Sequence, residues 1–517
     1  MAGTAPRQFP SALLLVTFFA LLAILHSPLL GLPYFWDEAG YYVPAARDLL
    51  LHGWLIPHTT PSNAHPPLGM AYLALAWKTL GCAPVVTRLA MLLVAAFTLL
   101  GLFRLAERVA NRQVAVASVL CTALYPVFFT QSSLAQVDLA AAGFTFWALL
   151  AYVENRRVMT ALWFSLAVLS KETALLASLG LFLWEAIVAA VSGRRWRGRP
   201  LAPTLLFPII LLALWYAYHR LRTGFIFGNP EFLRYNVQAT LHPLRIFFAL
   251  LMRIWQLVGY MNLYPLTLAT LAAMLLPPLG DPNYDQPRPR IAPETQFAFL
   301  AVIAAYALAM SFIGGAVLAR YMLPAVPLGI VICVSTLWRR IRFWRLVIAL
   351  VLSAFVAALF VNPPYGFTLE DNLAYRNYIL LHQRAETFLE ARYPMARVLT
   401  AWPASGELSQ PWLGYVTRPM RVVQIENFTL EELMSAAKQR PRFDAALVFS
   451  TKYEPLHPLL PRWQAWERIK AEFFGYYRDV PPAAAAQLLG GRLVYSEMRQ
   501  GQWVGVIELE PVEEAAR

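Results

Sequence analysis

Charged residues are scarce in this 517-residue chain. They make up 14% of the sequence, whereas apolar residues make up 58%. A soluble protein of this length needs more charge to cover its surface, so the composition excludes a single water-soluble globule. Apolar runs of about 20 residues recur before residue 363 and indicate a polytopic helical membrane protein. These runs lack the alternation of apolar and polar residues that is typical of a transmembrane barrel.

Cysteines and nucleotide-binding motifs are also scarce. Cys82, Cys121 and Cys333 stand singly in apolar surroundings, without a CxxC pair, so they are predicted to be packing residues rather than a disulfide framework. The sequence contains no P-loop, GxGxxG, HExxH or GxSxG element, so it offers no recognisable site for cytoplasmic nucleotide chemistry.

The net charge of +13 comes from the apolar part of the chain. Residues from Gly366 onward carry 17 basic and 18 acidic side chains, so the whole positive excess precedes them. Basic loops between apolar helices suit an anionic lipid surface. This distribution argues against a nucleic-acid partner and for a membrane.

Eleven apolar segments can be threaded through a membrane by the positive-inside rule. Alternate connections carry arginine clusters and are predicted to face the cytoplasm. The first segment is expected to be a retained helix rather than a cleaved signal peptide. The run 67–80 is too short to span and predicts a surface helix, and 246–278 is compatible with one helix or two. The predicted spans are 11–31, 85–104, 114–130, 139–153, 158–169, 174–191, 201–219, 259–278, 297–313, 322–338 and 346–362. The arginine clusters are at 104–112, 156–157, 194–199 and 339–345.

The composition changes after residue 362, where charges become dense and no further run can span. An odd number of spans places this segment outside the cytoplasm. The sequence therefore predicts a transmembrane domain at 1–362 and an extracytoplasmic soluble α/β domain at 363–517. Strands are expected at 397–402, 421–425, 445–449, 493–495 and 503–509, and helices at 430–439, with Thr429 and Glu432 as a capping box, and at 463–473.

Two adjacent carboxylates, Asp37 and Glu38, follow the first apolar segment and stand among aromatic residues. A structural alternative is that Asp37 is the N-cap of a surface helix that runs to Leu51. That role does not account for two acids at a membrane boundary, where carboxylates are costly and usually functional. The pair predicts a catalytic base or a ligand for a divalent ion.

Other polar residues fall on the same predicted outer face. Asp138 begins a helix, where it is either an N-cap or a second catalytic acid. Lys171 and Glu172 either neutralise each other, or Lys171 contacts a phosphate. Arg320, which precedes Tyr321, either extends to lipid headgroups or clamps a lipid-linked phosphate. His65 is as compatible with a structural role as with a functional one. The candidate site residues are thus Asp37, Glu38, Asp138, His65, Lys171, Glu172, Arg320 and Tyr321.

These residues resemble a known family. The run that contains Trp36-Asp37-Glu38, Tyr41, Ala45 to Leu50, Gly53-Trp54, Pro57 and Pro66-Pro67-Leu68 resembles the first outer loop of the protein O-mannosyltransferase and aminoarabinose transferase superfamily, the GT-C membrane glycosyltransferases. Asp138, Lys171-Glu172 and Arg320-Tyr321 before Leu323-Pro324 are similar to its further motifs. The resemblance extends from about residue 10 to residue 340.

The resemblance implies an inverting transfer of a sugar from a polyprenyl-phosphate carrier. The acceptor is a lipid, a glycan or a protein on the outer side of a cell (inner) membrane. Asp37 is implied as the leading catalytic carboxylate, with Glu38 and Asp138 in support, and the other candidates as substrate or phosphate contacts. His65 stands where related aminoarabinose transferases often carry a lysine, so Lys171 or Arg320 is the alternative phosphate contact.

The sequence is compatible with more than one answer on two points: whether the protein binds a metal, and to which functional class it belongs. Acidic pairs bind divalent ions in some GT-C enzymes and act without metal in others, so no cofactor is required and a divalent metal is compatible with the residues. A transporter or lipid-carrier flippase is the alternative function, and charges near mid-helix or related halves would favour it. A non-catalytic assembly or sensor protein with a partner-binding outer domain is the third hypothesis.

Overall fold

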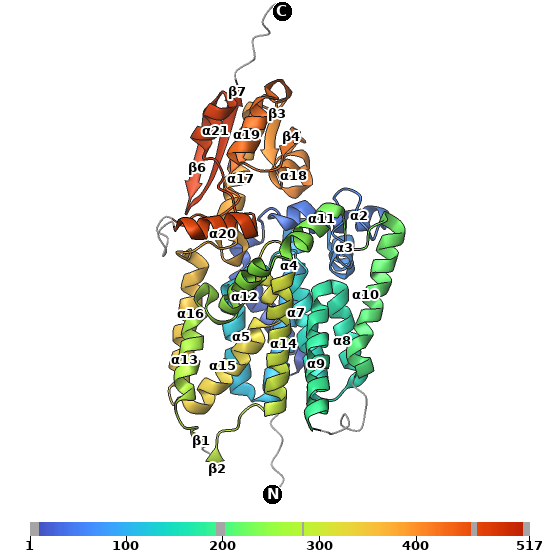
Figure 1. Cartoon of the computed structure of the whole chain (residues 1–517), viewed down its shortest axis with the longest axis vertical. Helices are drawn as coiled ribbons and strands as arrows, with labels where there is room; N and C mark the ends of the chain where they lie inside the picture. The colour runs from blue at the N-terminus through green and yellow to red at the C-terminus, as the bar shows by residue number, and fades with distance from the viewer. Residues whose placement is uncertain (1–9, 193–201, 282–283, 456–462, 510–517) are drawn as a thin grey trace, which may run out of the picture. The chain divides into compact units, whose positions relative to one another are not determined.

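The computed structural model describes residues 10–192, 202–281, 284–455 and 463–509 (Figure 1). Its contacts group the chain into two compact units. The first, which we call the bundle unit, comprises Met1–Leu30 and Ser62–Ala357, and the second, the sheet unit, comprises Gly31–Pro61 and Ala358–Arg517. The segment Gly31–Pro61 therefore groups with the C-terminal part of the chain. The boundary predicted between residues 362 and 363 stays a prediction.

The bundle unit is helical, because a helix satisfies its backbone hydrogen bonds internally, as an apolar surrounding requires. Each of the eleven apolar segments predicted from the sequence contains a helix. The helices are α1 (Ser11–Leu25), α3 (Leu68–Leu80), α4 (Pro84–Val109), α5 (Arg112–Leu124), α6 (Pro126–Gln131), α7 (Asp138–Val153), α8 (Arg157–Ser170), α9 (Leu175–Ser192), α10 (Ala202–Thr223), α11 (Pro230–Asn236), α12 (Pro243–Val258), α13 (Tyr264–Met274), α14 (Pro293–Phe312), α15 (Val326–Arg340) and α16 (Trp344–Phe360), whose last residues belong to the sheet unit. A short hairpin pairs β1 (Gly280–Asp281) with β2 (Tyr284–Pro287).

Five helices in the described ranges are long and apolar enough to cross a membrane, and they lie at Pro84–Val109, Glu172–Val191, Pro203–Thr223, Pro243–Asn262 and Pro293–Phe312. Six shorter apolar helices accompany them. The predicted multi-pass helical architecture is therefore supported. The number of eleven spans and the outward side remain predictions, and the arginine cluster at 194–199 lies outside the described residues.

The ambiguous region 246–278 forms two helices. Between α12 and α13, Met261 and Asn262 adopt left-handed φ angles of 48° and 62° and break the helix. The run 67–80 forms α3, as predicted.

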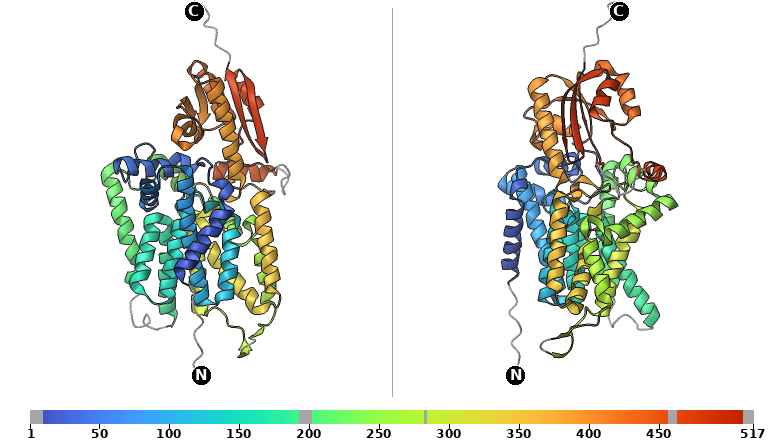
Figure 2. Two further views of the ribbon diagram at one scale, coloured as in Figure 1. Left: turned by 180° about the vertical axis from the view of Figure 1, so that it is seen from behind. Right: turned by 90° about the vertical axis from the view of Figure 1, so that its left-hand side faces the viewer.

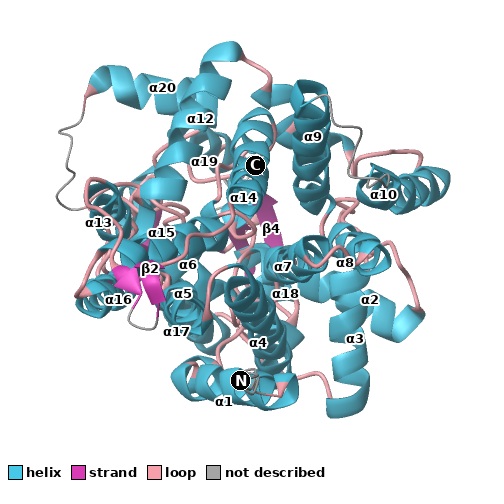
Figure 3. Cartoon of the chain, turned by 90° about the horizontal axis from the view of Figure 1, so that it is seen from below, coloured by secondary structure: helices cyan, strands magenta, loops and turns pink. Residues whose placement is uncertain are grey.

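Helix α7 packs between α4 and α8, as the end-on view in Figure 3 and the rear view in Figure 2 show. The approach to α4 is close because α7 presents a glycine. A Cβ atom on Gly143 would lie 2.4 Å from the Oγ1 atom of Thr98. Small residues at such contacts allow helix backbones to pack tightly inside a membrane.

The sheet unit contains a five-stranded sheet in the order β4-β3-β5-β7-β6. Strands β3, β4 and β5 are parallel, and β7 pairs antiparallel with β5 and β6. All five predicted strands and both predicted helices are present. Helices α17, α18 and α21 were not predicted. The elements are α2 (Val43–His52), α17 (Ala374–Arg392), β3 (Arg397–Ala401), α18 (Ala404–Ser409), β4 (Arg421–Ile425), α19 (Leu430–Ala437), β5 (Ala445–Phe449), α20 (Gln464–Phe474), α21 (Pro482–Leu489), β6 (Gly491–Arg499) and β7 (Gln502–Leu509).

Aromatic contacts attach the segment Gly31–Pro61 to the rest of the sheet unit. The ring of Phe35 lies 5.2 Å from that of Tyr378 on α17, and the ring of Trp36 lies 5.4 Å from that of Trp402. The hydroxyl of Tyr415 donates a hydrogen bond of 2.8 Å to the carbonyl of Tyr34. Edge-to-face aromatic pairs add about 0.5–1.5 kcal/mol each beyond their burial. The loop next to Asp37 is thus fixed by a C-terminal helix and strand end.

The close packing of α4 and α7 predicts a specific effect of enlarging Gly143. We expect Gly143→Val to lower the free energy of unfolding by about 1–3 kcal/mol, because the added methyl groups collide with Thr98. Thermal unfolding in detergent measures this effect. Gly329→Ala in α15 is the matched control, because an added Cβ meets nothing within 4 Å there. Equal midpoints of thermal unfolding for Gly143→Val and Gly329→Ala would contradict the close packing of α4 against α7.

Candidate active site

A buried ion pair joins the first residue of α7 to the residue that follows α8. The two helices are neighbours connected by a short turn, so Asp138 at the start of α7 and Lys171 after the end of α8 lie at the same end of the pair. The ammonium of Lys171 donates to Oδ1 of Asp138, and the two side chains are 5% and 3% exposed. A burial this complete keeps both charges out of water and strengthens their attraction.

Arg320 and Tyr321 complete this cluster from a 3₁₀ turn at Ala319–Met322. Nε of Arg320 lies 3.4 Å from Oδ2 of Asp138. Nζ of Lys171 lies 4.0 Å from the centre of the Tyr321 ring, a cation–π contact. Asp138 makes no capping hydrogen bond, because Val137 occupies the N-cap position of α7. The N-cap alternative for Asp138 is therefore wrong: its charge is balanced by two cations and by the helix N-terminus.

Two arginines of α12 hold the loop that leads into this turn. Arg253 donates to the carbonyl of Leu318 at 2.7 Å and to Gln256 Oε1 at 2.8 Å. Arg245 donates to the carbonyls of Gly314 and Gly315 at 2.7 and 3.0 Å. Neither arginine is among the candidates predicted from the sequence. The sequence does contain a signal for them: two ionisable residues eight positions apart share one face of an apolar helix, and such residues are usually functional or structural in a membrane.

His65 and Glu172 form a second pair beside the first. Nδ1 of His65 lies 2.9 Å from Oε2 of Glu172, and the carbonyl next to His65, on Ala64, accepts a 2.8 Å hydrogen bond from the Trp215 indole. Lys171 and Glu172, adjacent in the chain, thus each bond to a distant partner rather than to one another. The six candidates in the bundle unit thus form two groups, which are adjacent because Lys171 and Glu172 are neighbours in the chain. The first group is Asp138, Lys171, Arg320 and Tyr321, and the second is His65 and Glu172.

Asp37 and Glu38 belong to the sheet unit and have different environments. Glu38 is fully buried, and its Oε2 accepts a 2.8 Å hydrogen bond from the backbone of Phe35, so it braces its own turn. Asp37 is half-buried and occupies the cap position of the π-helical turn Glu38–Tyr42 without a capping hydrogen bond. The predicted position of Asp37 at the start of a surface helix is thus confirmed, since this turn leads directly into α2, but its side chain makes no capping hydrogen bond.

The backbone around Asp37 is unusual. Trp36 adopts a φ of +45°, which costs energy for a residue with a side chain, and the π-helical turn starts two residues later. Strained residues and π-turns are concentrated at functional sites, because the surrounding packing holds them in place. Here the aromatic contacts of Phe35 and Trp36 provide that packing.

The buried ion pair predicts a strong stability effect at Lys171. Lys171→Met leaves the Asp138 carboxylate with less compensation and is expected to lower the free energy of unfolding by about 3 kcal/mol. The double variant Asp138→Leu with Lys171→Met is expected to recover most of that loss. Arg108→Met is the control, because Arg108 is 57% exposed and its pair with Glu154 is 3.9 Å long. Additive losses in the double variant would contradict the pairing.

Comparison with known proteins gives a family match and a structural match. Residues 64–218 match the family model described as dolichyl-phosphate-mannose-protein mannosyltransferase. This segment includes His65, Asp138, Lys171 and Glu172. No curated protein matches the chain.

The structural matches span nearly the whole chain at low identity. ArnT from Cupriavidus metallidurans bound to undecaprenyl phosphate matches with a TM-score of 0.51 and 14% identity, over 95% of this chain and 97% of ArnT. The apo state of ArnT matches with a TM-score of 0.49 and 14% identity, over 96% of this chain and 98% of ArnT. The Archaeoglobus fulgidus oligosaccharyltransferase in the apo form matches with a TM-score of 0.46 and 12% identity, over 85% of this chain and 70% of that protein. The family model over residues 64–218 agrees with the resemblance seen in the sequence, and the match to ArnT shows that the chain shares its fold.

Proposed function

We propose that the protein transfers a sugar from a polyprenyl-phosphate carrier to an acceptor hydroxyl or amine on the extracytoplasmic side, with inversion at the anomeric carbon. The observation that carries the proposal is the buried cluster of Asp138, Lys171, Arg320 and Tyr321. It places an ammonium and a guanidinium together at one end of an apolar bundle, where a lipid-linked phosphate would present its negative charge.

The cations would act on the departing phosphate. An ammonium has three donor hydrogens, and Lys171 directs one of them to Asp138. Asp138 thus orients Lys171, and the guanidinium of Arg320 lies beside the same carboxylate. Donors that are already in position stabilise a developing negative charge without reorganisation when the bond breaks. In this proposal Lys171 and Arg320 bind the phosphate, and Asp138 positions them.

Asp37 is proposed as the general base. The acceptor oxygen or nitrogen attacks the anomeric carbon and forms the new glycosidic bond, while the bond from that carbon to the phosphate oxygen breaks. The phosphate leaves with the electron pair, and Asp37 takes the acceptor proton. Attack from the side opposite to the phosphate inverts the configuration. Glu38 supports Asp37 through its hydrogen bond to the backbone of the turn.

The carrier class is supported by the fold. ArnT, which shares this fold, is bound to undecaprenyl phosphate in one of its structures. The arginine-rich turn at 156–157 lies at the far end of α7 and α8 from Asp138 and Lys171, and the positive-inside rule would place that end in the cytoplasm. This arrangement favours an extracytoplasmic site.

The test is to incubate the purified full-length protein with a panel of polyprenyl-phosphate sugars and candidate acceptors. Formation of a glycosylated acceptor together with free carrier phosphate, in equal amounts, is the expected result. In proteoliposomes, movement of carrier across the bilayer without any transfer would instead support the flippase alternative and overturn the proposal.

The proposed base predicts the effect of an isosteric change. Asp37→Asn removes the basic carboxylate and is expected to slow transfer by about 10²–10⁴-fold. The unfolding midpoint of the variant is measured alongside, so that a loss of transfer is separated from a loss of folded protein. Glu431→Gln, an exposed acid in the first turn of α19, is the control and should keep full activity. Full activity of Asp37→Asn would remove Asp37 from the mechanism.

A further inference from the structure

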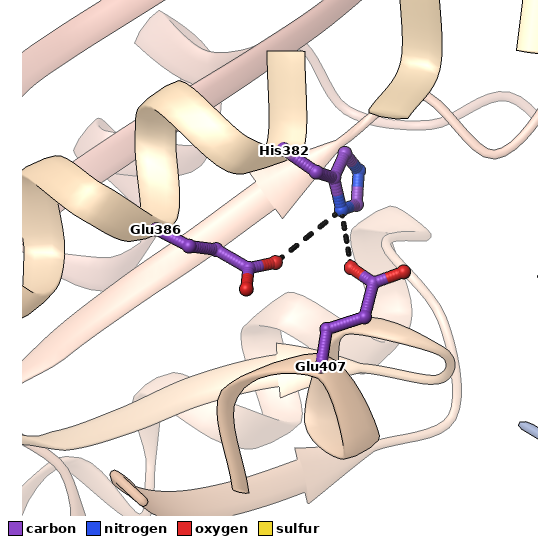
Figure 4. Close-up of side chains that lie close together, drawn as sticks. All are labelled: His382, Glu386 and Glu407. Atoms are coloured by element: carbon purple, nitrogen blue, oxygen red, sulfur yellow. Dashed lines mark hydrogen bonds and ion pairs between the residues drawn. The ribbon is translucent and has the colours of Figure 1, made fainter. Parts of the chain in front are cut away.

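Three ionisable side chains meet in the interior of the sheet unit, and none of them is among the candidates from the sequence. His382 and Glu386 lie one turn apart on α17, and Glu407 lies on α18 (Figure 4). Nδ1 of His382 is 2.6 Å from Oε2 of Glu407 and 3.5 Å from Oε1 of Glu386. The three side chains are at most 1% exposed. One potential ligand atom from each lies within 4.8 Å of the others.

The polar atoms of this cluster are incompletely satisfied. Both carboxylate oxygens of Glu386 and Oε1 of Glu407 are buried without a hydrogen-bond partner. Within the described part of the chain, no lysine or arginine pairs with either acid, and His382 is their shared partner. A proton shared between Glu386 and Glu407 satisfies two of these three oxygens and leaves the third without a partner. Buried carboxylates in this condition are typically either neutralised or bound to a metal.

We propose that His382, Glu386 and Glu407 bind a divalent transition-metal ion of the Zn²⁺ type, which links α17 to α18. One imidazole nitrogen and two carboxylates are a ligand set that suits zinc and its neighbours, whereas calcium prefers six to eight oxygen ligands.

The charges and distances fit such an ion. Two carboxylates and a neutral imidazole carry a charge of −2, which a divalent cation cancels. A tetrahedral ion with bonds of about 2.0–2.2 Å separates its ligand atoms by about 3.3 Å. The pair with Glu386 already has that spacing, and Glu407 needs to withdraw by less than about 1 Å.

An aromatic shell surrounds the imidazole. The ring of Tyr378 stacks on His382 with 3.9 Å between centroids, and the ring of Phe449 lies at 4.5 Å. Such a shell excludes water and fixes the orientation of the ligand. The same Tyr378 ring contacts Phe35 and Trp36. A metal at this position would therefore stiffen the helix that holds the turn next to Asp37.

Metal content of the full-length protein tests the proposal, independently of sugar transfer. The protein is purified without a polyhistidine tag, and its metals are measured by mass spectrometry. We expect about one Zn²⁺ per chain. His382→Gln, Glu386→Gln and Glu407→Gln should each lose it. Glu390→Gln, one turn further along α17 and bonded to Thr417, should keep it.

A second measurement needs no variant and covers the case in which these substitutions prevent folding. The wild-type protein is stripped with a chelator and refilled with Co²⁺ or Zn²⁺. Co²⁺ should give the visible absorption of a tetrahedral site, and Zn²⁺ should raise the unfolding temperature in proportion to the logarithm of its concentration. Protein without stoichiometric metal, and stripped protein that shows only the spectrum of hydrated Co²⁺, would overturn the proposal in favour of proton sharing among the three groups.

Discussion

The bundle unit depends on compensating one buried negative charge. A carboxylate that is 3% exposed, such as that of Asp138, destabilises an apolar bundle by several kcal/mol unless opposite charges surround it. Lys171 and Arg320 supply these charges, but only if the end of α8 and the turn before α15 both reach the start of α7. Arg253 and Arg245 then fix the loop before that turn through its carbonyls. Compensating the charge of Asp138 therefore brings together α7, α8, α12 and the turn before α15.

The same arrangement suits the proposed chemistry, because the contacts that stabilise the bundle unit also hold the proposed phosphate-binding groups in position. The packing that holds Lys171 against Tyr321 and Asp138 also keeps its ammonium in position before any substrate arrives. His65 illustrates the limits of motif transfer. It stands where relatives often have a lysine, and in this chain it pairs with Glu172, the neighbour of Lys171. The proposed phosphate-binding role therefore falls to Lys171 and Arg320, and His65 pairs with the residue next to Lys171.

The sequence predicted the features that periodicity and charge encode locally. Apolar runs located a helix in each of the eleven predicted spans, and the alternation of arginine-rich loops placed Asp138, Lys171 and Arg320 on one face, where the ion pairs show that they meet. Arg245 and Arg253 lie inside an amphipathic helix, α12, and not in a loop, so the loop pattern does not signal them. Helix α17 was missed because it follows the last apolar segment without a cap signal: its N-cap residue, Leu373, makes no capping hydrogen bond. No local pattern signals that residues 31–61 pack on it, since such contacts join distant parts of the chain.

The packing of residues 31–61 on the C-terminal part of the chain has a consequence for the order in which the protein folds. The hydrogen bond from Tyr415 to Tyr34 joins residues 381 positions apart. The turn with Asp37 therefore leaves the ribosome early, but its packing partners on α17 and after β3 are synthesised after the helices of the bundle unit. Contacts of such long sequence separation form slowly and late. The turn with Asp37 gains these contacts only after the helices of the bundle unit have been synthesised, so a chain that ends before α17 lacks the packing that holds the turn.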